Sequence, residues 1–387
     1  AAASASGSFR DVARQSGASP NWGAVGGIAV LAVFMLMLIY TTIAGWTMDY
    51  FVRAAAGEFD QISAAQSKSM FDSLVASPGR LIFWHTAVVI ITVYINSRGL
   101  QAGIERAVNV LMPALFVSML LMVAYSVTVG DIGAAARFLL TPDFSAVTWN
   151  TVLMALGQAF FSIGIAMAVM ITYGSFLDRD TSIPRNAFIV VGADTLVALL
   201  AGFAIFPIVF AHNLPLDSGA GLVFETLPIV FGDLPGGRLF GGIFFLLLIA
   251  AAITSCIGNV APVVAWTREK LRLSHVQAAV VAGAVMWLLG LGSVFSFNLL
   301  SDFHPLAFIS LFEGKTIYDC FDYIMSNMLL PIGAFLTAVF IGWFASREGI
   351  RDEMGLKDGA GFRLWRLLIR FVVPIAVAAI FIGGIMG

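Results

Sequence analysis

Long apolar runs recur along the whole chain, and they constrain its fold more than any other feature of the sequence. Most of them reach the roughly 20 residues that a helix needs to cross the hydrocarbon core of a bilayer. Only 11% of the residues are charged, whereas soluble domains carry roughly 25%. We therefore predict an all-α polytopic transmembrane helix bundle with about nine spans. The runs lie near residues 24–47, 81–96, 108–129, 149–173, 187–211, 239–266, 276–298, 323–345 and 366–386.

Lysine and arginine residues are distributed unequally between the two sides that alternating spans define. With a cytoplasmic N-terminus, fifteen of them lie on the inner side and six on the outer side. The positive-inside rule favours this orientation, and an odd number of spans then places the C-terminus outside. We expect one multi-pass domain over 1–387 in the inner (plasma) membrane, with a cytoplasmic loop at 1–20 and an extracellular lid-like loop at 212–238. The net charge of −2 gives no indication of nucleic-acid binding.

The fourth run resembles a span that is not one continuous helix. Gly157, Ser162 and Gly164 lie in its middle, and their low helix propensity favours a break there. A break at membrane depth frees backbone carbonyls, which is tolerated where they line a cavity or bind an ion. The alternative is that these small residues let helices pack closely, and spacing alone favours that alternative.

Two polar residues inside other runs need partners. Tyr40 places a phenol deep in the first run, where either a backbone carbonyl or a polar ligand would satisfy its hydroxyl. Asp194 lies about two turns into the fifth run. A carboxylate at mid-span costs about 2.5–3.5 kcal/mol on insertion scales, so Asp194 is expected to face a partner or an ion.

The sixth run carries a polar face. Ala251, Thr254 and Ser255 lie on one side of a helix, where one carbonyl and two hydroxyls can converge on a hard cation. The alternative is that both hydroxyls bond to carbonyls of their own helix. Asn259, one turn further along, extends the polar stripe.

Four stretches together resemble the neurotransmitter:sodium symporter family, and most closely its eleven-helix bacterial amino acid transporters. They occur in the family's order and are IYTTIAGW, GQAFFSIGIAMAVMITYGSF, GAGLVFETLP and TSCIGN with Pro262 after it. The resemblance implies a leucine-transporter-like inverted-repeat fold, in which this chain corresponds to family helices three to eleven. It also implies sodium-coupled symport of a neutral amino acid by alternating access, with two Na⁺ sites.

The resemblance further implies roles for individual residues. Tyr40 would bind the substrate carboxylate, Phe161 would cover the substrate, and Ser162 would give its hydroxyl to the first sodium. The implied substrate-binding residues are Tyr40, Phe161, Ser162, Gly164, Ile165, Met167, Ser255 and Asn259. The implied sodium ligands are Ser162, Asp194, Ala251, Thr254 and Ser255, and the implied gate residues are Gln158, Asp322 and Glu269.

The sequence also departs from the family pattern. Asp194 occupies a position where many members have an Asn ligand, and Ala198 lies near the chloride position. A carboxylate there can supply the negative charge that chloride provides elsewhere, so we expect chloride not to be required. Phe176 replaces a tyrosine of the inner gate. No stretch resembles family helices one and two, so the alternative function is a non-transporting fragment or an amino acid-binding membrane protein.

An enzyme is not expected. Catalysis would need a paired nucleophile and base or a metal cluster at one depth, but the four histidines are scattered singly and have no metal-ligand spacing. The two cysteines indicate no disulfide framework. Among the implied pocket residues, Phe161, Ile165 and Met167 favour a hydrophobic amino acid as substrate, while Asn259 can admit a polar group.

Overall fold

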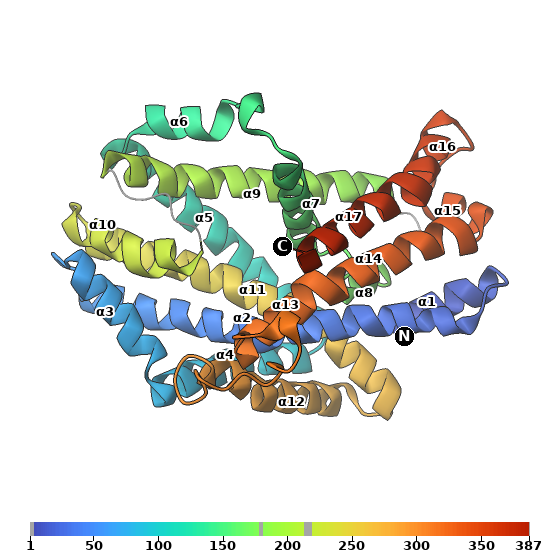
Figure 1. The fold of residues 1–387 in the computed structure, drawn as a ribbon, viewed down its shortest axis with the longest axis horizontal. Helices are drawn as coiled ribbons and strands as arrows, with labels where there is room; N and C mark the ends of the chain where they lie inside the picture. The colour runs from blue at the N-terminus through green and yellow to red at the C-terminus, as the bar shows by residue number, and fades with distance from the viewer. Residues whose placement is uncertain (1–3, 178–180, 213–218, 387) are drawn as a thin grey trace.

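The computed structural model describes residues 4–177, 181–212 and 219–386. Its helices in this part of the chain are α1 Ala5–Gln15, α2 Gly23–Ala56, α3 Ala64–Val75, α4 Pro78–Ser97, α5 Arg106–Val129, α6 Ile132–Leu140, α7 Trp149–Ile163, α8 Ala168–Gly174, α9 Ile183–Ala211, α10 Leu227–Asp233, α11 Gly237–Leu271, α12 His275–Phe295, α13 Ile317–Tyr323, α14 Leu330–Val339, α15 Arg347–Glu353, α16 Ala360–Leu367 and α17 Val373–Met386. Eight helical stretches are long and apolar enough to cross a membrane, and the bent pair α7 and α8 brings the number to nine. The predicted all-α bundle is confirmed (Figure 1).

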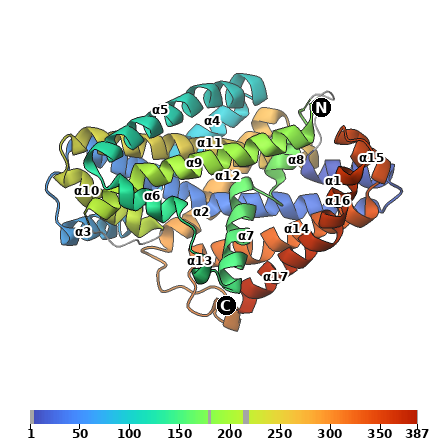
Figure 2. The same cartoon turned by 90° about the horizontal axis from the view of Figure 1, so that it is seen from above.

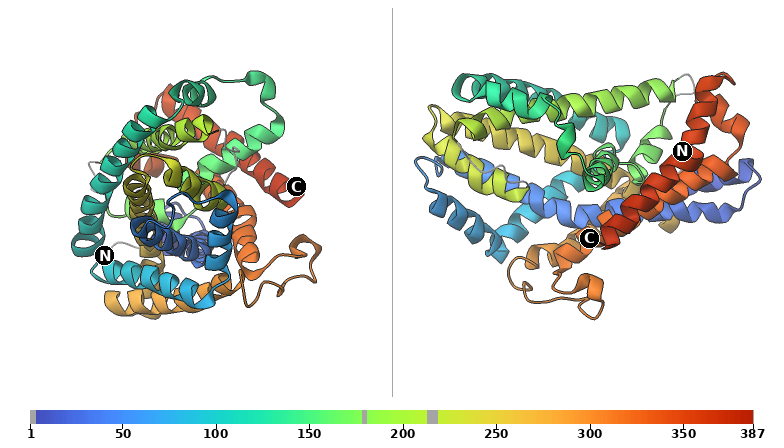
Figure 3. Two further views of the ribbon diagram at one scale, coloured as in Figure 1. Left: turned by 90° about the vertical axis from the view of Figure 1, so that its left-hand side faces the viewer. Right: turned by 45° about the horizontal axis from the view of Figure 1, so that its top comes forward.

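Helix α2 forms the centre of the bundle. It packs along α11, α4 and α12, and the view along the long axis shows these helices around it (Figure 3). Small residues bring the helices close: a Cβ atom on Gly45 would lie 3.0 Å from the Cβ atom of Trp84 in α4. Seen from above, α14 and α17 lie side by side on one flank of the bundle, with α5 on the opposite flank (Figure 2). Residues 296–316, between α12 and α13, extend away from the bundle (Figure 3).

Five short π-helical segments occur in the described chain. They are η2 Leu100–Glu105, η4 Leu222–Thr226, η6 Ile324–Leu329, η7 Phe340–Phe344 and η8 Leu368–Val372. A π turn closes its hydrogen bond one residue further along than an α turn does. One of these turns, η6, joins α13 to α14, and η7 continues α14 to Phe344, so that together they form a single span, Ile317–Phe344.

The segment 1–20 is not an irregular loop where the structure describes it. It forms α1, which begins after Ser4, whose side chain accepts a hydrogen bond from the Gly7 amide. Ala5, Phe9 and Ala13 are buried against neighbouring helices, and their spacing of four residues gives α1 an apolar face. The many small polar residues around them obscured this pattern. The cytoplasmic location of the segment stays a prediction.

The segment 212–238 is helical over much of its described part. Residues 213–218 lie outside the described residues. After them come η4 and α10, which bury Phe224, Leu227, Val230 and Phe231. These two elements pack on α3 and α11. A packed helical cover therefore replaces the expected loop, because its apolar residues find neighbours on both sides. Its extracellular location stays a prediction.

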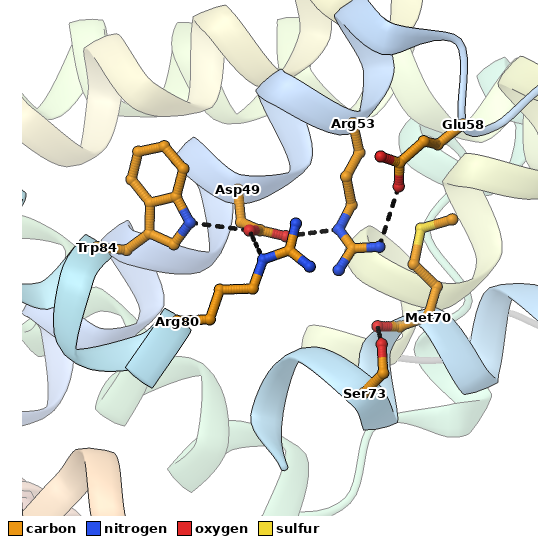
Figure 4. A network of polar contacts seen from close by, with 7 residues as sticks. All are labelled: Asp49, Arg53, Glu58, Met70, Ser73, Arg80 and Trp84. Atoms are coloured by element: carbon orange, nitrogen blue, oxygen red, sulfur yellow. Dashed lines mark hydrogen bonds and ion pairs between the residues drawn. The ribbon is translucent and has the colours of Figure 1, made fainter. Parts of the chain in front are cut away.

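A buried ion-pair network joins α2 to the start of α4. This Asp49 network consists of Asp49, Arg53, Glu58, Arg80 and Trp84 (Figure 4). Asp49 accepts hydrogen bonds from Arg53 Nε at 2.6 Å, from Trp84 Nε1 at 2.8 Å and from Arg80 Nε. Arg53 Nη1 reaches Glu58 Oε2 at 3.1 Å. Only 1% of the Asp49 side chain is exposed, so water cannot solvate its carboxylate. The hydrogen bonds from these donors stabilise the negative charge instead.

Replacing Asp49 with Asn should lower the free energy of unfolding by about 3–5 kcal/mol, because Arg53 stays buried while its charged partner is lost. Denaturant unfolding of the purified protein in detergent measures the change. Asp358→Asn is the matched control, since Asp358 pairs with Arg347 while 44% of its side chain is exposed. That exposed pair should contribute about 1 kcal/mol or less. Equal losses in the two variants would contradict the role of the Asp49 network.

Candidate functional site

The fourth apolar run is broken, as the sequence predicts. α7 ends at Ile163 and α8 begins at Ala168, with a bend of 41° between them. At the break Gly164 has φ +71° and Ala166 has φ +66°, so both adopt the left-handed conformation. This conformation is unfavourable for a residue with a side chain. Ala166 therefore stores backbone strain that the packing of its neighbours offsets.

The break presents a hydroxyl to the carboxylate of α9. Ser162, in the last turn of α7, donates a hydrogen bond from Oγ to Asp194 Oδ1 at 2.7 Å. These two residues come from helices that are distant in sequence, and they are both proposed ligands of the first sodium. Hydroxyl and carboxylate oxygens are the ligands that hard cations prefer. Among the described residues no group of three His, Cys, Asp or Glu could hold a metal ion, so a cation here would depend on hydroxyl and carbonyl oxygens beside one carboxylate.

On the polar face of α11, Thr254 bonds to carbonyls of its own helix. Such local hydrogen bonds were the alternative to a cation site. Thr254 Oγ1 donates to Ala250 O at 2.8 Å and approaches Ala251 O at 3.0 Å. A hydroxyl that donates its hydrogen keeps both lone pairs for a cation. The second sodium site therefore stays a prediction. Ser255 is exposed and lies beside the Tyr40 hydroxyl.

Tyr40 and the Ala251 side of α11 border the same cavity, of about 690 Å³. Its walls are mostly apolar and aromatic, and they come from α2, α3, η4, α11 and the segment around α13. The lining residues are Tyr40, Ile43, Ala44, Trp46, Thr47, Phe71, Gly219, Ala220, Val223, Phe224, Leu248, Ala251, Ala252, Phe297 and Tyr318. We call this space the Tyr40 cavity.

The remaining proposed substrate residues lie elsewhere in the described structure. Phe161 and Ile165 line a second hollow of about 270 Å³ between α7, α14 and α17. Met167 is only 4% exposed and packs into the core with residues of α2 and α11. Gly164 is at the break itself, and Asn259 is half-buried on α11. The structure thus joins Tyr40 with the α11 face, and Ser162 with Asp194, but Phe161 and Ile165 line a different hollow from the Tyr40 cavity.

The proposed gate residues lie in two places. Gln158 lines the 270 Å³ hollow together with Ser326, whose hydroxyl is 3.3 Å from Asp322 Oδ1. Glu269 accepts a hydrogen bond from the Ser4 amide at 3.0 Å, and its other oxygen is 3.7 Å from Arg10 Nη1. It also borders a cavity of about 730 Å³ that Phe176, just after α8, lines as well.

Comparison with known proteins decides the family. The profile described as the sodium:neurotransmitter symporter family matches residues 58–387. The chain belongs to this family. It is similar to the uncharacterised sodium-dependent transporter YhdH of Bacillus subtilis, with 36% identity over 93% of this chain and 79% of YhdH. An uncharacterised sodium-dependent transporter of Haemophilus influenzae is 33% identical over 95% of this chain and 80% of its own length.

A solved structure is similar over almost the whole symporter chain. The crystal structure of MhsT in complex with L-phenylalanine matches with a TM-score of 0.87 and 35% identity, covering 99% of this chain and 85% of MhsT. The resemblance inferred from sequence, the leucine-transporter-like fold and the classification as a sodium-dependent membrane transporter are therefore confirmed. Members of this family are transporters, so the expectation that the protein is not an enzyme is confirmed as well.

Sequence reasoning on the symporter missed two polar contacts. The first is the Asp49 network, although the spacing of Asp49 and Arg53 by four residues at the end of the first run was a signal for an ion pair. The second is the contact of α1 with Glu269, which joins residues that are 265 positions apart. No local pattern predicts such a pairing.

Gly164→Ala tests whether the break needs the left-handed conformation. We expect the free energy of unfolding to fall by about 1–2 kcal/mol, because an L side chain at φ +71° is strained. The new methyl group would not clash, since its nearest neighbour is Met167 Sδ at 4.0 Å. Gly157→Ala is the control, because it lies inside α7 in open space and should be neutral or stabilising. Thermal unfolding measures both variants, and equal effects would refute the assignment.

Proposed function

We propose that this transporter is a sodium-coupled symporter of neutral, mainly hydrophobic amino acids that works by alternating access. The observation that carries the proposal is the Tyr40 cavity, which places the phenols of Tyr40 and Tyr318 and the Ala251 side of α11 around a mostly apolar space of about 690 Å³. Cavities of roughly 300–1,000 Å³ with few polar groups are typical of small-molecule sites. The Tyr40 hydroxyl donates to the substrate carboxylate, while the aromatic wall accepts an apolar side chain.

The similar structure supports the same class of substrate. MhsT was solved with L-phenylalanine, a neutral amino acid whose side chain suits an aromatic wall. Neither Trp46 nor Phe71 nor Phe224 carries a charge that would pair with an acidic or basic side chain. A charged substrate side chain would lose its hydration in this cavity without compensation.

Two sodium ions couple to transport in this proposal. Ser162 and Asp194 contribute to the first site, and Ala251, Thr254 and Ser255 contribute to the second. A membrane potential of about 100 mV is worth roughly 2.3 kcal/mol per charge, and a tenfold gradient adds about 1.4 kcal/mol. Two ions together supply roughly 7 kcal/mol, which can concentrate a neutral amino acid by about five orders of magnitude. The Asp194 carboxylate makes chloride unnecessary.

The chain is a multi-pass membrane protein, and we propose the plasma membrane with a cytoplasmic N-terminus. The end of the bundle that contains Glu269 would then face the cytoplasm. Arg268 and Arg272 line the cavity at this end, and Arg10 lies beside Glu269. This clustering of arginine agrees with the positive-inside rule. Lipid surrounds the apolar outer faces of the helices.

A ligand screen of the purified protein tests the function. L-phenylalanine at 100 times its dissociation constant should raise the free energy of unfolding by about 2.7 kcal/mol in sodium. The shift should disappear when choline replaces sodium, and L-glutamate should give no shift. Uptake of labelled L-phenylalanine into vesicles with an inward sodium gradient then separates symport from the alternative of a binding protein, which predicts the shift without uptake.

Asp194→Asn tests the proposed charge balance. Sodium-dependent stabilisation of the unmodified protein should survive replacement of chloride by gluconate. The variant should bind sodium about tenfold more weakly, or regain affinity only in chloride, because its first site has lost about 1.4 kcal/mol of charge interaction. Asp143→Asn, at an exposed position between α6 and α7, is the control. An unchanged sodium response of the Asp194 variant in gluconate would refute the idea.

A further inference from the structure

Three hydrogen-bond donors on one face of α2 lack partners. Trp46 Nε1, Tyr50 Oη and Arg53 Nη2 are all buried, and none has a hydrogen-bond partner among the described residues. They follow one another at spacings of four and three residues, so they point to the same side of the helix. Tyr50 is 0% exposed and Arg53 is 5% exposed. Buried donors are almost always satisfied in native proteins, so this row requires an explanation.

The Asp49 network holds the guanidinium of Arg53 in place. Arg53 Nε and Nη1 bond to Asp49 and Glu58 (Figure 4), which leaves Nη2 without a hydrogen-bond partner among the described residues. Arg53 and Arg80 both pair with Asp49, so these three residues carry one net positive charge. Glu58 neutralises it weakly, because 46% of its side chain is exposed and water screens its charge. The site around Arg53 Nη2 therefore attracts a further carboxylate.

The cover formed by η4 places a carboxylate near Tyr50, one of these donors. Phe224 contacts the Tyr50 ring with a centroid distance of 5.0 Å, and it also contacts Trp46 at 5.7 Å. Its neighbour Glu225 is half-buried, and its carboxylate is near enough to Tyr50 for a charge interaction. The Ser67 hydroxyl donates to the Glu225 carbonyl at 2.6 Å. Among the described hydrogen bonds none involves the Glu225 carboxylate.

The backbone of the cover departs from regular α-helix where it borders the Tyr40 cavity. η4 is a π turn, a geometry with an extra residue per hydrogen-bonded ring that recurs at functional sites. Gly219, with φ +79°, precedes it, and both Gly219 and Val223 line the Tyr40 cavity. A small change in η4 therefore alters the opening of this cavity and the position of Glu225 at the same time.

We propose that Glu225, Tyr50 and Arg53 form a latch that closes η4 over the Tyr40 cavity, with the Glu225 carboxylate accepting hydrogen bonds from Tyr50 Oη and Arg53 Nη2. The structure shows the arrangement in which this contact is not made. The latch rests on the proposed function only in that it controls access to the same cavity. Because unpartnered donors disfavour the open arrangement, the latched state predominates in the resting protein.

Chemical modification of a cysteine inside the cavity tests the latch. Thr47→Cys places a thiol in the cavity wall, and the native Cys256 and Cys320 are both buried and give the background rate. The rate with a small water-soluble maleimide is measured without any amino acid. Adding Glu225→Gln or Tyr50→Phe should raise it about tenfold, since each removes a bond between a charged group and its donor. The double variant should be no faster than either single variant.

Two comparisons keep the test decisive. Asp233→Asn changes an exposed carboxylate of α10, in the same cover, and should leave the rate unchanged. If the Tyr50 hydroxyl has no partner in any state, Tyr50→Phe should stabilise the protein and leave the rate unchanged, which would overturn the latch. Additive effects of Glu225→Gln and Tyr50→Phe would overturn it as well. Absence of sodium-driven uptake would refute the symport proposal alone, because the modification rate needs no substrate.

Discussion

A polar group inside a membrane protein must find its partner within the protein, and the local geometry of this symporter depends on that constraint. Asp49 is buried at the end of a long apolar helix, and three donors from two helices surround it. Ser162 and Asp194 satisfy each other across the break in the fourth span. Thr254 uses carbonyls of its own helix. Each pairing fixes one helix relative to another or keeps a hydroxyl oriented.

The broken span borders the 270 Å³ hollow on one side of its break and the packed core of the bundle on the other. Phe161 of α7 and Ile165 in the break line the hollow beside α14 and α17, while the α8 side of the break packs Met167 into the core with α2 and α11. Phe161 thus lies on the α7 side of the break and Met167 on the α8 side.

Much of the fold was predictable because span length and hydrophobicity act locally. The apolar runs predicted the membrane-spanning helices, and the low helix propensity of Gly157, Ser162 and Gly164 predicted the break. The approach of Ser162 to Asp194 came from family resemblance, since no local pattern relates positions on α7 and α9. Helix α1 was missed because small polar residues diluted its apolar face. The partners of Asp49 and Glu269 were missed because tertiary packing alone brings Arg80 and Ser4 to them.

The π turns bear on how such a chain tolerates changes in length. An α-helix that gains one residue rotates everything beyond it by about 100°, which would turn a lipid-facing side chain toward the interior. Where η6 lies between α13 and α14, the extra residue is absorbed in one wide turn and both flanking helices keep their faces. Insertions and deletions of single residues can therefore accumulate at η6 and η7 during evolution, whereas the uninterrupted α2 admits none without exchanging its buried and exposed sides.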